Sequence, residues 1–537
     1  MRSPSGGVQR SVIVVGAGMG GLACAVDLAR QGVAVDVFES AEAPGGKIHQ
    51  QLIAQRPIDS GPTVITMPWV FEDLLHAAGR RLSDYVELHR LPILARHAWD
   101  ADQWFDLHDN PQATEQAIAE FAGGDEAARF VRFSQEAKAL YSRLESGYMR
   151  SSRPSLWSMS TDLGPAGLAL LASIGPMQSL WKSLGRHFKD ARLRQLFARY
   201  ATYCGGSPWQ APATLMLIAY VEMRGVWQAR GGMQALGNGM AKAATDLGAR
   251  IHYEKDVVEI LVNNDRASGV RLASGEELHC DAVVFNGDVA ALYEGLLGKK
   301  VRKAVRGKET RPRSLSALTW AMTASTDCRL DFHNVFFQSP YEQEFKDIFD
   351  RGRLPRRPTI YVCAQDRGPM GATAHPTGSG SAAPGNASVN ATPGGDERLF
   401  LLINAPARGD AGAAFSNQEF DACTSSAFTH LSRCGLRLDP HTSLMALTTP
   451  VQFHRRFPAT GGALYGRAPH GWTSIFHRPS AQSQLPGLFL AGGSVHPGAG
   501  VPMAALSGRL AAATLMAHLD SISSSSRVVI SGGMSMG

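Results

Sequence analysis

No part of the chain limits its fold as strongly as residues 11–40, "SVIVVGAGMGGLACAVDLARQGVAVDVFES". The β-branched run at 12–15 predicts a strand that is buried on both faces, and the turn after it has the form G-x-G-x-x-G. Small and apolar residues then recur at helical spacing over 22–30, and residues 33–38 predict a second strand. The order strand, glycine turn, helix and strand predicts a Rossmann-like unit of the α/β class that binds a dinucleotide.

This first glycine turn has the residue types that a pyrophosphate site requires. Gly16 allows the tight turn, Gly18 lets the backbone approach the pyrophosphate, and Gly21 lets helix and strand pack closely, with Ala17 inside the same turn. Glu39 ends the second strand, where its carboxylate can accept hydrogen bonds from both hydroxyls of an adenosine ribose and repels a 2′-phosphate. We expect these residues to bind the adenosine half of a cofactor. The alternative is a glycine-rich turn that binds nothing.

A second glycine cluster lies near the other end of the chain, in "GLFLAGGSVHPGAGVPMAALSG", residues 487–508. It predicts a strand at 488–490, a backbone that can approach a ligand closely, and a helix with Pro502 in its first turn. The first N–H groups of a helix lack internal partners, so we expect them to face the pyrimidine edge of a flavin. The residues expected to contact the flavin half are Gly492, Gly493, Val501, Met503 and Ala504. The two clusters would then hold opposite ends of one FAD, unless they are unrelated turns.

Two features between these clusters favour FAD over NAD. Gly46 and Lys47, just after the second strand, supply bare backbone and a cation for the diphosphate and the flavin side of a longer cofactor. Gly61, Pro62 and Thr63 predict a stiff turn near the flavin, or a bare turn without that role. After this point the chain leaves the βαβ pattern that a simple NAD domain continues.

The α/β pattern returns at about residue 229, with a helix expected over 233–247 and strands over 250–253 and 257–262. Val257 begins the last of these strands. Its backbone is expected to pair with the adenine of FAD, and the alternative is a core valine.

These patterns predict an α/β protein with an FAD-binding Rossmann-like domain assembled from discontinuous segments, a mixed-sheet substrate domain and a helical lid. The predicted segments are 11–68, 229–300 and 485–520 for the FAD-binding domain, 69–110 and 301–484 for the substrate domain, and 111–228 for the lid. Residues 367–397, rich in Gly, Ala, Ser, Pro, Asn and Thr, are expected to form a disordered insert, and residues 521–537 a disordered tail.

The helical lid contains an uncharged stretch at residues 163–181, followed by Lys182, Arg186 and Lys189. Its length resembles a membrane span, but two Gly-Pro pairs divide it into pieces too short to cross a bilayer. It is interpreted either as an interfacial element that dips into a membrane or as a buried lid helix or tunnel wall.

The amino-acid composition limits which binding partners and which cellular compartment are expected for the chain. Seven cysteines are scattered singly with no CxxC pair, which argues against a disulfide framework or a metal site and fits a reducing cytoplasm. The net charge of +6 fits a mildly basic soluble protein or attraction to an anionic membrane surface. No basic run is interleaved with aromatic residues, so nucleic acid is not expected as a partner.

The sequence names no catalytic side chain. His496 lies in the predicted flavin loop, but beside Pro497 it is expected to be structural. Glu222, in "AYVEMRG", is expected to pair with Arg224.

With these motifs in place, the chain resembles the carotenoid desaturase family of amine-oxidase-like (GR2) flavoproteins. The motifs that carry the resemblance are "VIVVGAGMGGLACAVDLARQG", "FESAEAPGGK", "GGALYGRAPH" and "GLFLAGGSVHPGAGVPMAALSG", and it extends over residues 11–519 except 367–397. Many broader flavin oxidoreductases hold the ribityl chain with an acid in the last motif. Here Gly493 and Ser494 replace that acid, as is common in carotenoid desaturases. Four further stretches, "DSGPTVITMPWVFEDLL", "HNVFFQSPY", "TIYVCAQDR" and "LLINAPARGD", resemble the hydroxyneurosporene desaturase group of purple bacteria.

The resemblance implies hydride transfer from an allylic CH₂ to FAD, with formation of the C3–C4 double bond of a 1-hydroxy or 1-methoxy acyclic carotenoid in spheroidene or spirilloxanthin biosynthesis. It implies an apolar carotenoid as substrate and a cytoplasmic protein attached peripherally to the inner or photosynthetic membrane, while the electron acceptor stays unidentified. The alternatives are another carotenoid desaturase or isomerase, a flavin amine oxidase-like enzyme, and a prenyl-lipid binder that is not an enzyme.

Overall fold

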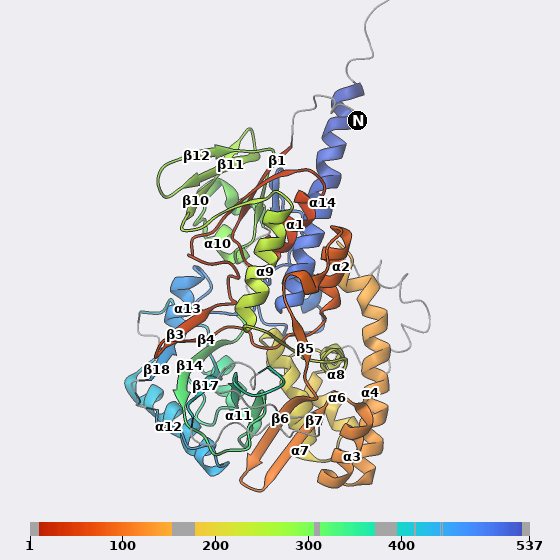
Figure 1. The fold of residues 1–537 in the computed structure, drawn as a ribbon, viewed down its shortest axis with the longest axis vertical. Helices are drawn as coiled ribbons and strands as arrows, with labels where there is room; N and C mark the ends of the chain where they lie inside the picture. Colours follow the sequence, from red (N-terminus) through yellow and green to blue (C-terminus); the bar gives the residue numbers. More distant parts are fainter. Residues whose placement is uncertain are drawn as a thin grey trace, which may run out of the picture.

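The computed structural model of the protein describes residues 10–152, 178–305, 312–370, 395–412, 415–440, 442 and 444–528. Two large sheets dominate this part of the chain, one in the upper half of Figure 1 and one in the lower half. The upper sheet carries the glycine turns, and the lower sheet forms a wall of the cavity described below.

The upper sheet has five parallel strands contributed by three distant parts of the sequence. Their order is β19 (Leu488–Leu490), β13 (Ala282–Phe285), β1 (Ser11–Val15), β2 (Ala34–Phe38) and β9 (Arg250–His252). Because β1 and β19 flank β13, the first and last strands of the chain end at the same edge of the sheet. The discontinuous Rossmann-like sheet expected from the sequence is therefore present, while the exact domain boundaries stay a prediction.

Alternating residues of β1 and β2 face two different cores. One core packs Val12, Val14 and Val35 against α1 (Met19–Ala29), α9 (Met233–Asp246), α2 (Trp69–Ala77) and α14 (Val501–Val528). The other packs Ile13 and Phe38 against a small antiparallel sheet and α10 (Val289–Glu294). That small sheet is formed by β10 (Val257–Asn263), β11 (Arg266–Leu272) and β12 (Glu277–His279).

The lower sheet is mixed and has seven strands, with only β6 and β15 parallel among its neighbours. Its order is β18 (Met445–Thr448), β14 (Ser316–Ala324), β17 (Glu397–Ala405), β16 (Ile360–Ala364), β15 (His333–Phe336), β6 (Ile93–Asp100) and β7 (Gln103–His108). One face packs on α12 (Asn417–Arg433), and the opposite face turns toward a group of helices.

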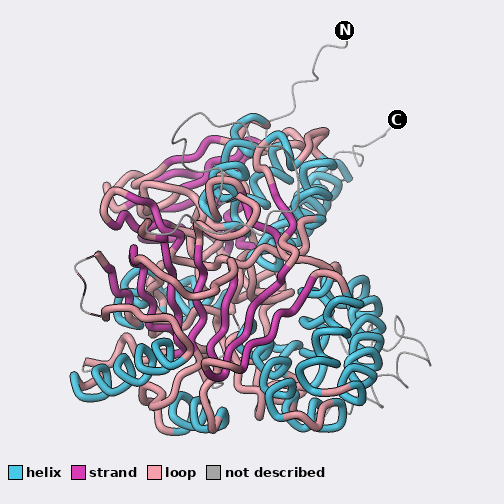
Figure 2. Tube along the Cα trace, turned by 60° about the horizontal axis from the view of Figure 1, so that its bottom comes forward, coloured by secondary structure: helices cyan, strands magenta, loops and turns pink. Residues whose placement is uncertain are grey.

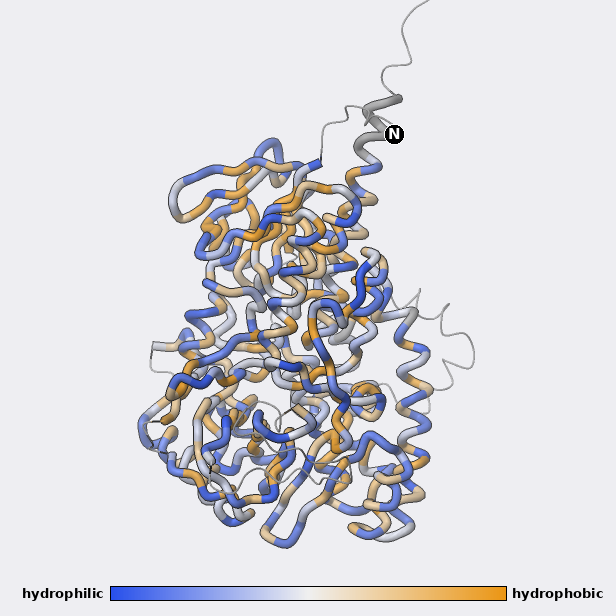
Figure 3. Tube along the Cα trace, in the orientation of Figure 1, coloured by the Kyte–Doolittle hydropathy of each residue, from blue (hydrophilic) through white to orange (hydrophobic). Residues whose placement is uncertain are grey.

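That helical group stands beside the lower sheet and is seen as cyan coils at the lower right of Figure 2. It comprises α3 (Pro111–Ala122), α4 (Gly124–Leu144), the π-helical turn η2 (Glu145–Met149), α6 (Leu180–His187), α7 (Ala191–Ala198), η3 (Arg199–Cys204), η4 (Ala213–Met216) and α8 (Leu217–Met223). In α4 the buried residues Phe130, Phe133 and Leu140 recur at helical spacing, and Figure 3 shows the resulting alternation of hydrophobic and hydrophilic residues. The described residues of the predicted lid, 111–228, are mainly helical, except at its end where β8 begins at Trp227, and the bounds of the lid stay a prediction.

The remaining elements connect these layers. They are β3 (Gln50–Ile53), β4 (Arg56–Asp59), η1 (Leu82–Asp84), β5 (Leu88–Arg90), β8 (Trp227–Ala229), η5 (Lys299–Ala304), α11 (Tyr341–Phe345), η6 (Lys346–Asp350), α13 (Pro450–Arg456) and η8 (Ser474–His477). Among the helices of the described ranges, none combines the length and the apolar character needed to cross a bilayer. Most of the predicted interfacial stretch, residues 163–177, lies outside the described residues.

Two segments predicted to be disordered contain residues that the structure describes as ordered. Arg367 pairs with Glu397 at 2.5 Å and Met370 is buried, so both ends of the 367–397 segment are anchored, and residues 371–394 lie outside the described ones. The last helix continues to Val528, past the predicted limit at 520, because no proline or glycine follows Gly508 in it to end it. Arg367 and Glu397 could not be placed by composition because their pairing depends on the adjacent strand ends.

Candidate active site

The first glycine turn joins β1 to α1 and has the geometry that its sequence predicts. Gly16 has φ +99°, and a β-carbon on Gly21 would lie 2.1 Å from the carbonyl oxygen of Gly16, so no larger residue fits there. Gly18 is the N-cap of α1 and provides no side chain to its first N–H groups. The amino end of α1 is therefore a bare backbone surface with a positive dipole end, suited to an anionic ligand.

Glu39 is fixed beside this turn. One carboxylate oxygen accepts the N–H of Ala17 at 2.7 Å, and the other accepts the N–H of Ala41 at 2.9 Å. The side chain is buried at 8% exposure. The oxygen bonded to Ala17 keeps a further lone pair, whereas the other oxygen also accepts the Ser40 hydroxyl at 3.3 Å. The contact of Glu39 with a ribose stays a prediction.

The second glycine cluster lies directly against the first. A β-carbon on Gly20 would lie 2.8 Å from the backbone nitrogen of Gly492 and 2.9 Å from the carbonyl oxygen of Ala504. Figure 1 shows α1 and α14 side by side, in agreement with these contacts. The prediction that the two clusters converge is confirmed, because backbone from residue 20 meets backbone from residues 492 and 504.

Asn286 joins the two clusters, and the sequence analysis did not select it. Its amide nitrogen donates to the carbonyl oxygen of Gly16 at 3.1 Å, and its amide oxygen would lie 2.6 Å from a β-carbon on Gly20 and 3.2 Å from one on Gly492. Its position directly after β13, the strand beside β1, was the available signal, because carboxyl ends of neighbouring parallel strands meet at one edge.

The flavin end of the second cluster differs from the prediction at one residue. The N–H of Ala504 donates to the carbonyl oxygen of Gly500 at 2.8 Å, so it has a helical partner. The reason is that α14 begins at Val501, one turn before Ala504. The N–H groups of Val501 and Met503 have no hydrogen-bond partner among the described residues and stay available.

Gly46 and Lys47 lie at the crossing of these segments. Gly46 has φ +64°, and a β-carbon on it would lie 3.1 Å from Cα of Gly18. The half-buried Lys47 ammonium donates to the carbonyl oxygen of Leu464, and desolvation lowers the pKa of Lys47. A β-carbon on Gly61 would lie 2.0 Å from the carbonyl oxygen of Lys47, so the 61–63 turn packs on this segment.

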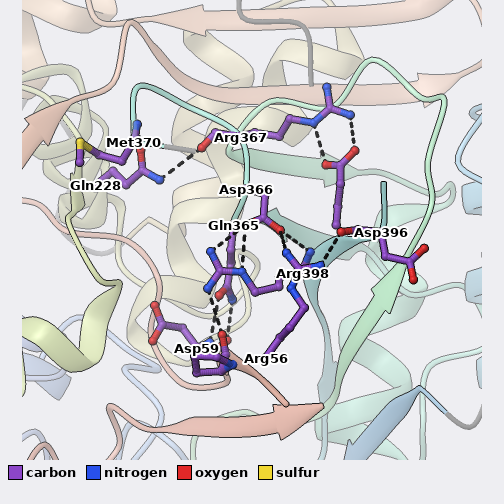
Figure 4. Close-up of polar contacts among 11 residues, drawn as sticks. Arg56, Asp59, Gln228, Gln365, Asp366, Arg367, Met370, Asp396 and Arg398 are labelled. Carbon is purple, nitrogen blue, oxygen red and sulfur yellow. Dashed lines mark hydrogen bonds and ion pairs between the residues drawn. The ribbon is translucent and has the colours of Figure 1, made fainter. Parts of the chain in front are cut away.

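A polar network at Asp59 fixes the start of the 61–63 turn (Figure 4). The backbone N–H of Asp59 donates to the Gln365 side chain at 3.0 Å, and Gln365 donates back to the Asp59 carbonyl at 2.8 Å. The Asp59 carboxylate accepts the N–H of Met233 at 2.7 Å and thus caps α9. Arg398 and Asp366 continue the network along β17, at 2.7 Å. The end of β4, the amino end of α9 and strand ends of the lower sheet are thereby tied to one loop.

Val257 is the first residue of β10, where it pairs with Leu272 of β11, and its side chain is buried in the core with Ile13. Its side chain fits the core-valine alternative, and the adenine contact of its backbone stays a prediction.

A cavity of about 370 Å³ lies between the flavin-side turns and the lower sheet. Its lining is mainly apolar. Of the residues predicted to contact the cofactor, Gly61, Pro62, Thr63, Val501 and Met503 line it. Its apolar wall includes Leu144, Met149, Leu215, Ile218, Val335, Phe400 and Leu402. A cavity with this lining favours an apolar ligand.

Two hydrogen-bonded groups stand in this wall. The Thr63 hydroxyl lies 2.6 Å from the Tyr361 hydroxyl, which in turn lies 2.6 Å from Nδ1 of His333. Burial lowers the pKa of His333 to about 3, so its imidazole is neutral. Thr63, Tyr361 and His333 therefore form a chain of neutral groups next to the 61–63 turn, and the buried Nε2 of His333 at its end has no hydrogen-bond partner among the described residues.

The second group corrects the expected pairing of Glu222. Its carboxylate binds Arg199 at 2.7 Å, Tyr203 at 2.9 Å and the Tyr200 hydroxyl, whereas Arg224 contacts the Tyr141 hydroxyl at 3.4 Å. The reason is that Arg199 is buried beside Glu222. Proximity in sequence did not identify the partner of Glu222, because Arg199 belongs to another element, η3.

His496 has the structural contact expected of it. Its Nε2 lies 2.9 Å from the carbonyl oxygen of Tyr148, and the two rings meet edge to face at 4.7 Å. Burial lowers the pKa of His496 to about 4. Among the described residues, no group of three or more His, Cys, Asp or Glu side chains is arranged to hold a metal ion.

A parallel sheet with two converging bare-backbone turns and an apolar cavity beside them defines a flavin-dependent oxidoreductase of the α/β class. Residues 19–516 match the model of the flavin containing amine oxidoreductases, and the chain belongs to this family.

Individual relatives agree with that assignment. The chain is 52% identical to the hydroxyneurosporene desaturase of Rubrivivax gelatinosus over 98% of this chain and 96% of the relative. It is 42% identical to the hydroxyneurosporene desaturase of Cereibacter sphaeroides over 95% of this chain and 98% of that relative. Among solved structures, putrescine oxidase bound to putrescine aligns with a TM-score of 0.57 at 14% identity, covering 95% of this chain and 99% of the other, which shows a shared fold.

The family implies FAD, and the residues of this chain fit it. The oriented carboxylate of Glu39 supplies an acceptor, and the uncapped amino end of α1 and the available N–H groups of Val501 and Met503 supply donors, of the kinds that the two ends of FAD require.

Proposed function

We propose that this chain is an FAD-dependent carotenoid desaturase that introduces the C3–C4 double bond into 1-hydroxy or 1-methoxy acyclic carotenoids such as 1-hydroxyneurosporene. This reaction belongs to spheroidene or spirilloxanthin biosynthesis. The observation that carries the proposal is the apolar cavity that borders both the 61–63 turn and residues 498–503. Near-full-length identity to hydroxyneurosporene desaturases supports the substrate class.

We assign two halves of the FAD site to the two glycine clusters. The adenosine and pyrophosphate half is assigned to Gly16, Ala17, Gly18, Gly21, Glu39 and Val257. The flavin half is assigned to Gly46, Lys47, Gly61, Pro62, Thr63, Gly492, Gly493, Val501, Met503 and Ala504. Ala504 belongs to this set through its backbone position rather than through its N–H.

Bound FAD would accept a hydride from the allylic carbon, and a proton would leave the neighbouring carbon, so that the double bond forms. The chain itself binds and orients: the apolar wall presents one carbon–carbon bond to the flavin turns and excludes water. The N–H groups of Val501 and Met503, at the positive end of α14, stabilise negative charge at that end of the site. We assign no side chain as catalytic acid or base, since the conjugated substrate delocalises developing charge.

The test is pigment analysis in a host that produces 1-hydroxyneurosporene. Expression of the chain is expected to yield the 3,4-desaturated product. No new double bond in that carotenoid, together with conversion of phytoene, neurosporene or putrescine supplied in parallel, would point to the other enzyme classes. Purified protein without a yellow flavin band after reconstitution with FAD would instead support a lipid binder that is not an enzyme.

We also propose that the protein is cytoplasmic and attaches peripherally to the inner or photosynthetic membrane. An apolar carotenoid dissolves in the bilayer, and a net charge of +6 favours an anionic surface. Cosedimentation with vesicles that contain anionic lipid is expected, and it should weaken at high salt. Protein that stays entirely in the supernatant at low salt would exclude this attachment.

A further inference from the structure

The polar side chains of the cavity wall mostly have protein partners. Thr63 binds Tyr361, and Tyr203 donates to Glu222 at 2.9 Å. Thr359 donates its hydroxyl to Glu344 at 2.7 Å. A side chain whose hydrogen-bonding atoms already have partners within the protein contributes little binding free energy to a ligand. A wall group with a fixed and unused polar atom is a better candidate for substrate recognition.

Asn404 is such a group. It lines the cavity from β17, and its amide nitrogen donates to Glu344 at 2.8 Å. No partner for its amide oxygen is found among the described residues. The amide oxygen is therefore the polar atom of Asn404 that the cavity can use.

Glu344, on α11, sets this orientation. Its side chain is 1% exposed, and one carboxylate oxygen accepts both the N–H and the hydroxyl of Thr359, at 3.0 and 2.7 Å. The other oxygen faces Asn404 and requires a donor, which only the NH₂ group of the amide provides. Glu344 thus fixes the Asn404 side chain with its NH₂ group toward Glu344 and its amide oxygen on the opposite side.

Strand pairing connects Asn404 to the end of the cavity where the proposed flavin site lies. Leu402, on the same face of β17, pairs with Tyr361, whose hydroxyl reaches Thr63 in the 61–63 turn. On the other side Asn404 pairs with Ala317 of β14. The residues before that strand contact the segment around Tyr465, which also lines the cavity. Asn404 therefore stands between two segments that border the proposed flavin site.

We propose that Asn404 binds the C1 hydroxyl of the carotenoid by accepting its O–H at the amide oxygen, with Glu344 as the positioning residue. This inference rests on the proposed function. The hydroxyl is only about 5 Å from C4 through bonds of about 1.5 Å, so its binding group has to lie near the reacting carbons. Because the amide oxygen accepts and cannot donate, it selects an alcohol over a methyl ether or a hydrocarbon, each of which leaves it unpaired. Hydroxyl groups of the wall, such as that of Tyr465, can donate to an alcohol or an ether alike.

The test compares kcat/KM for 1-hydroxyneurosporene and its 1-methoxy analogue, using the FAD-loaded full chain at about pH 8, where the Glu344 carboxylate, with a pKa raised by burial to about 7, is ionised. The wild type is expected to prefer the alcohol by about tenfold or more. Asn404→Leu should lower kcat/KM for the alcohol by about tenfold and change that for the ether by less than about threefold. Thr214→Val, another polar change in the same wall, should leave the ratio of the two constants unchanged.

Glu344→Gln separates positioning from a structural role. The new amide would accept from Thr359 with its oxygen and donate to Asn404 with its nitrogen, so that Asn404 turns its NH₂ group to the cavity. An NH₂ group can donate to an alcohol and to an ether equally. The ratio of kcat/KM for the alcohol to that for the ether should therefore fall toward one. A purely structural defect would lower both constants by the same factor and would count against the inference.

The outcomes distinguish the inference from the proposed function. If the wild type desaturates neither 1-substituted carotenoid, the proposed function is wrong. If it desaturates them but Asn404→Leu leaves the alcohol-to-ether ratio as in the wild type, the inference is overturned and the function stands. Flavin content and circular dichroism of each variant establish that folded holoenzyme is compared.

Discussion

Gly20 of α1 and Gly508 of α14 meet backbone to backbone: a β-carbon on Gly508 would lie 2.0 Å from the carbonyl oxygen of Gly20 and 3.0 Å from the nitrogen of Cys24. These residues belong to the first and last helices of the chain. Their contact sets how closely the two glycine turns approach, and the FAD site proposed above depends on that separation.

Gly508→Ala should therefore separate α1 from α14. The methyl group meets backbone that cannot rotate away, so we expect a loss of stability of about 3 kcal/mol and a large drop in bound FAD. Thermal unfolding and the ratio of flavin to protein absorbance measure both effects. Gly124→Ala, at the start of α4 with nothing within 4 Å, should leave both values unchanged. Normal flavin content in Gly508→Ala would show that the helix spacing is not critical.

Asn286→Asp should weaken FAD binding more than Asn286→Ala does. Both changes remove the donor to the Gly16 carbonyl, but aspartate also places a negative charge beside the turn assigned to the pyrophosphate. We expect the FAD dissociation constant to rise at least about tenfold for Asn286→Asp, measured by quenching of flavin fluorescence. Asn238→Asp, on the exposed side of α9, is the matched control. Equal affinities for Asn286→Asp and the wild type would remove Asn286 from the site.

The sequence predicted those parts of the site that are encoded locally. Gly16, Gly21 and Glu39 sit in one strand–turn–helix–strand unit, where spacing specifies geometry. Asn286 had only the signal of its position after a strand, and that position does not specify which strand lies beside it. Asn404, a single asparagine within a strand, had no sequence pattern.

Errors of the sequence analysis have the same origin. Glu222 pairs with Arg199 rather than with Arg224, because the choice of partner depends on how helices pack. The N–H of Ala504 has a helical partner because α14 starts at Val501, and helix ends are uncertain from sequence by a residue or two.

Glu222→Gln should be strongly destabilising. Arg199, whose side chain is 4% exposed, would keep its charge without a counter-charge in the cavity wall, at a cost of about 3–5 kcal/mol. The double change Arg199→Met with Glu222→Gln removes both charges and should be more stable than the single change. Thermal midpoints of the two variants check this order. Glu87→Gln, in an exposed pair with Arg230, serves as the control and should have little measurable effect. A double variant less stable than Glu222→Gln would contradict the argument.

Stability should fall on acidification because several histidines are desolvated and neutral in the folded chain, and the half-buried His470 gives the clearest test. Its Nε2 accepts the N–H of Ser207 at 3.0 Å, and burial lowers the pKa of His470 to about 4. Between the ordinary pKa of about 6.5 and pH 4 the unfolded chain binds the proton and the folded chain does not, so stability is lost as pH falls through this window. The loss from this residue is about 2 kcal/mol, after allowance for its partial exposure.

His470→Gln isolates that contribution, because the amide oxygen can still accept from Ser207 but does not titrate. The variant should lose less stability than the wild type between pH 7 and pH 4.5, measured as the shift of the unfolding midpoint in urea. His76→Gln, at an exposed site on α2, should reproduce the wild-type profile. If His470→Gln and the wild type lose the same stability over this range, His470 takes up its proton without disturbing the fold, and the bond from Ser207 does not require a neutral imidazole.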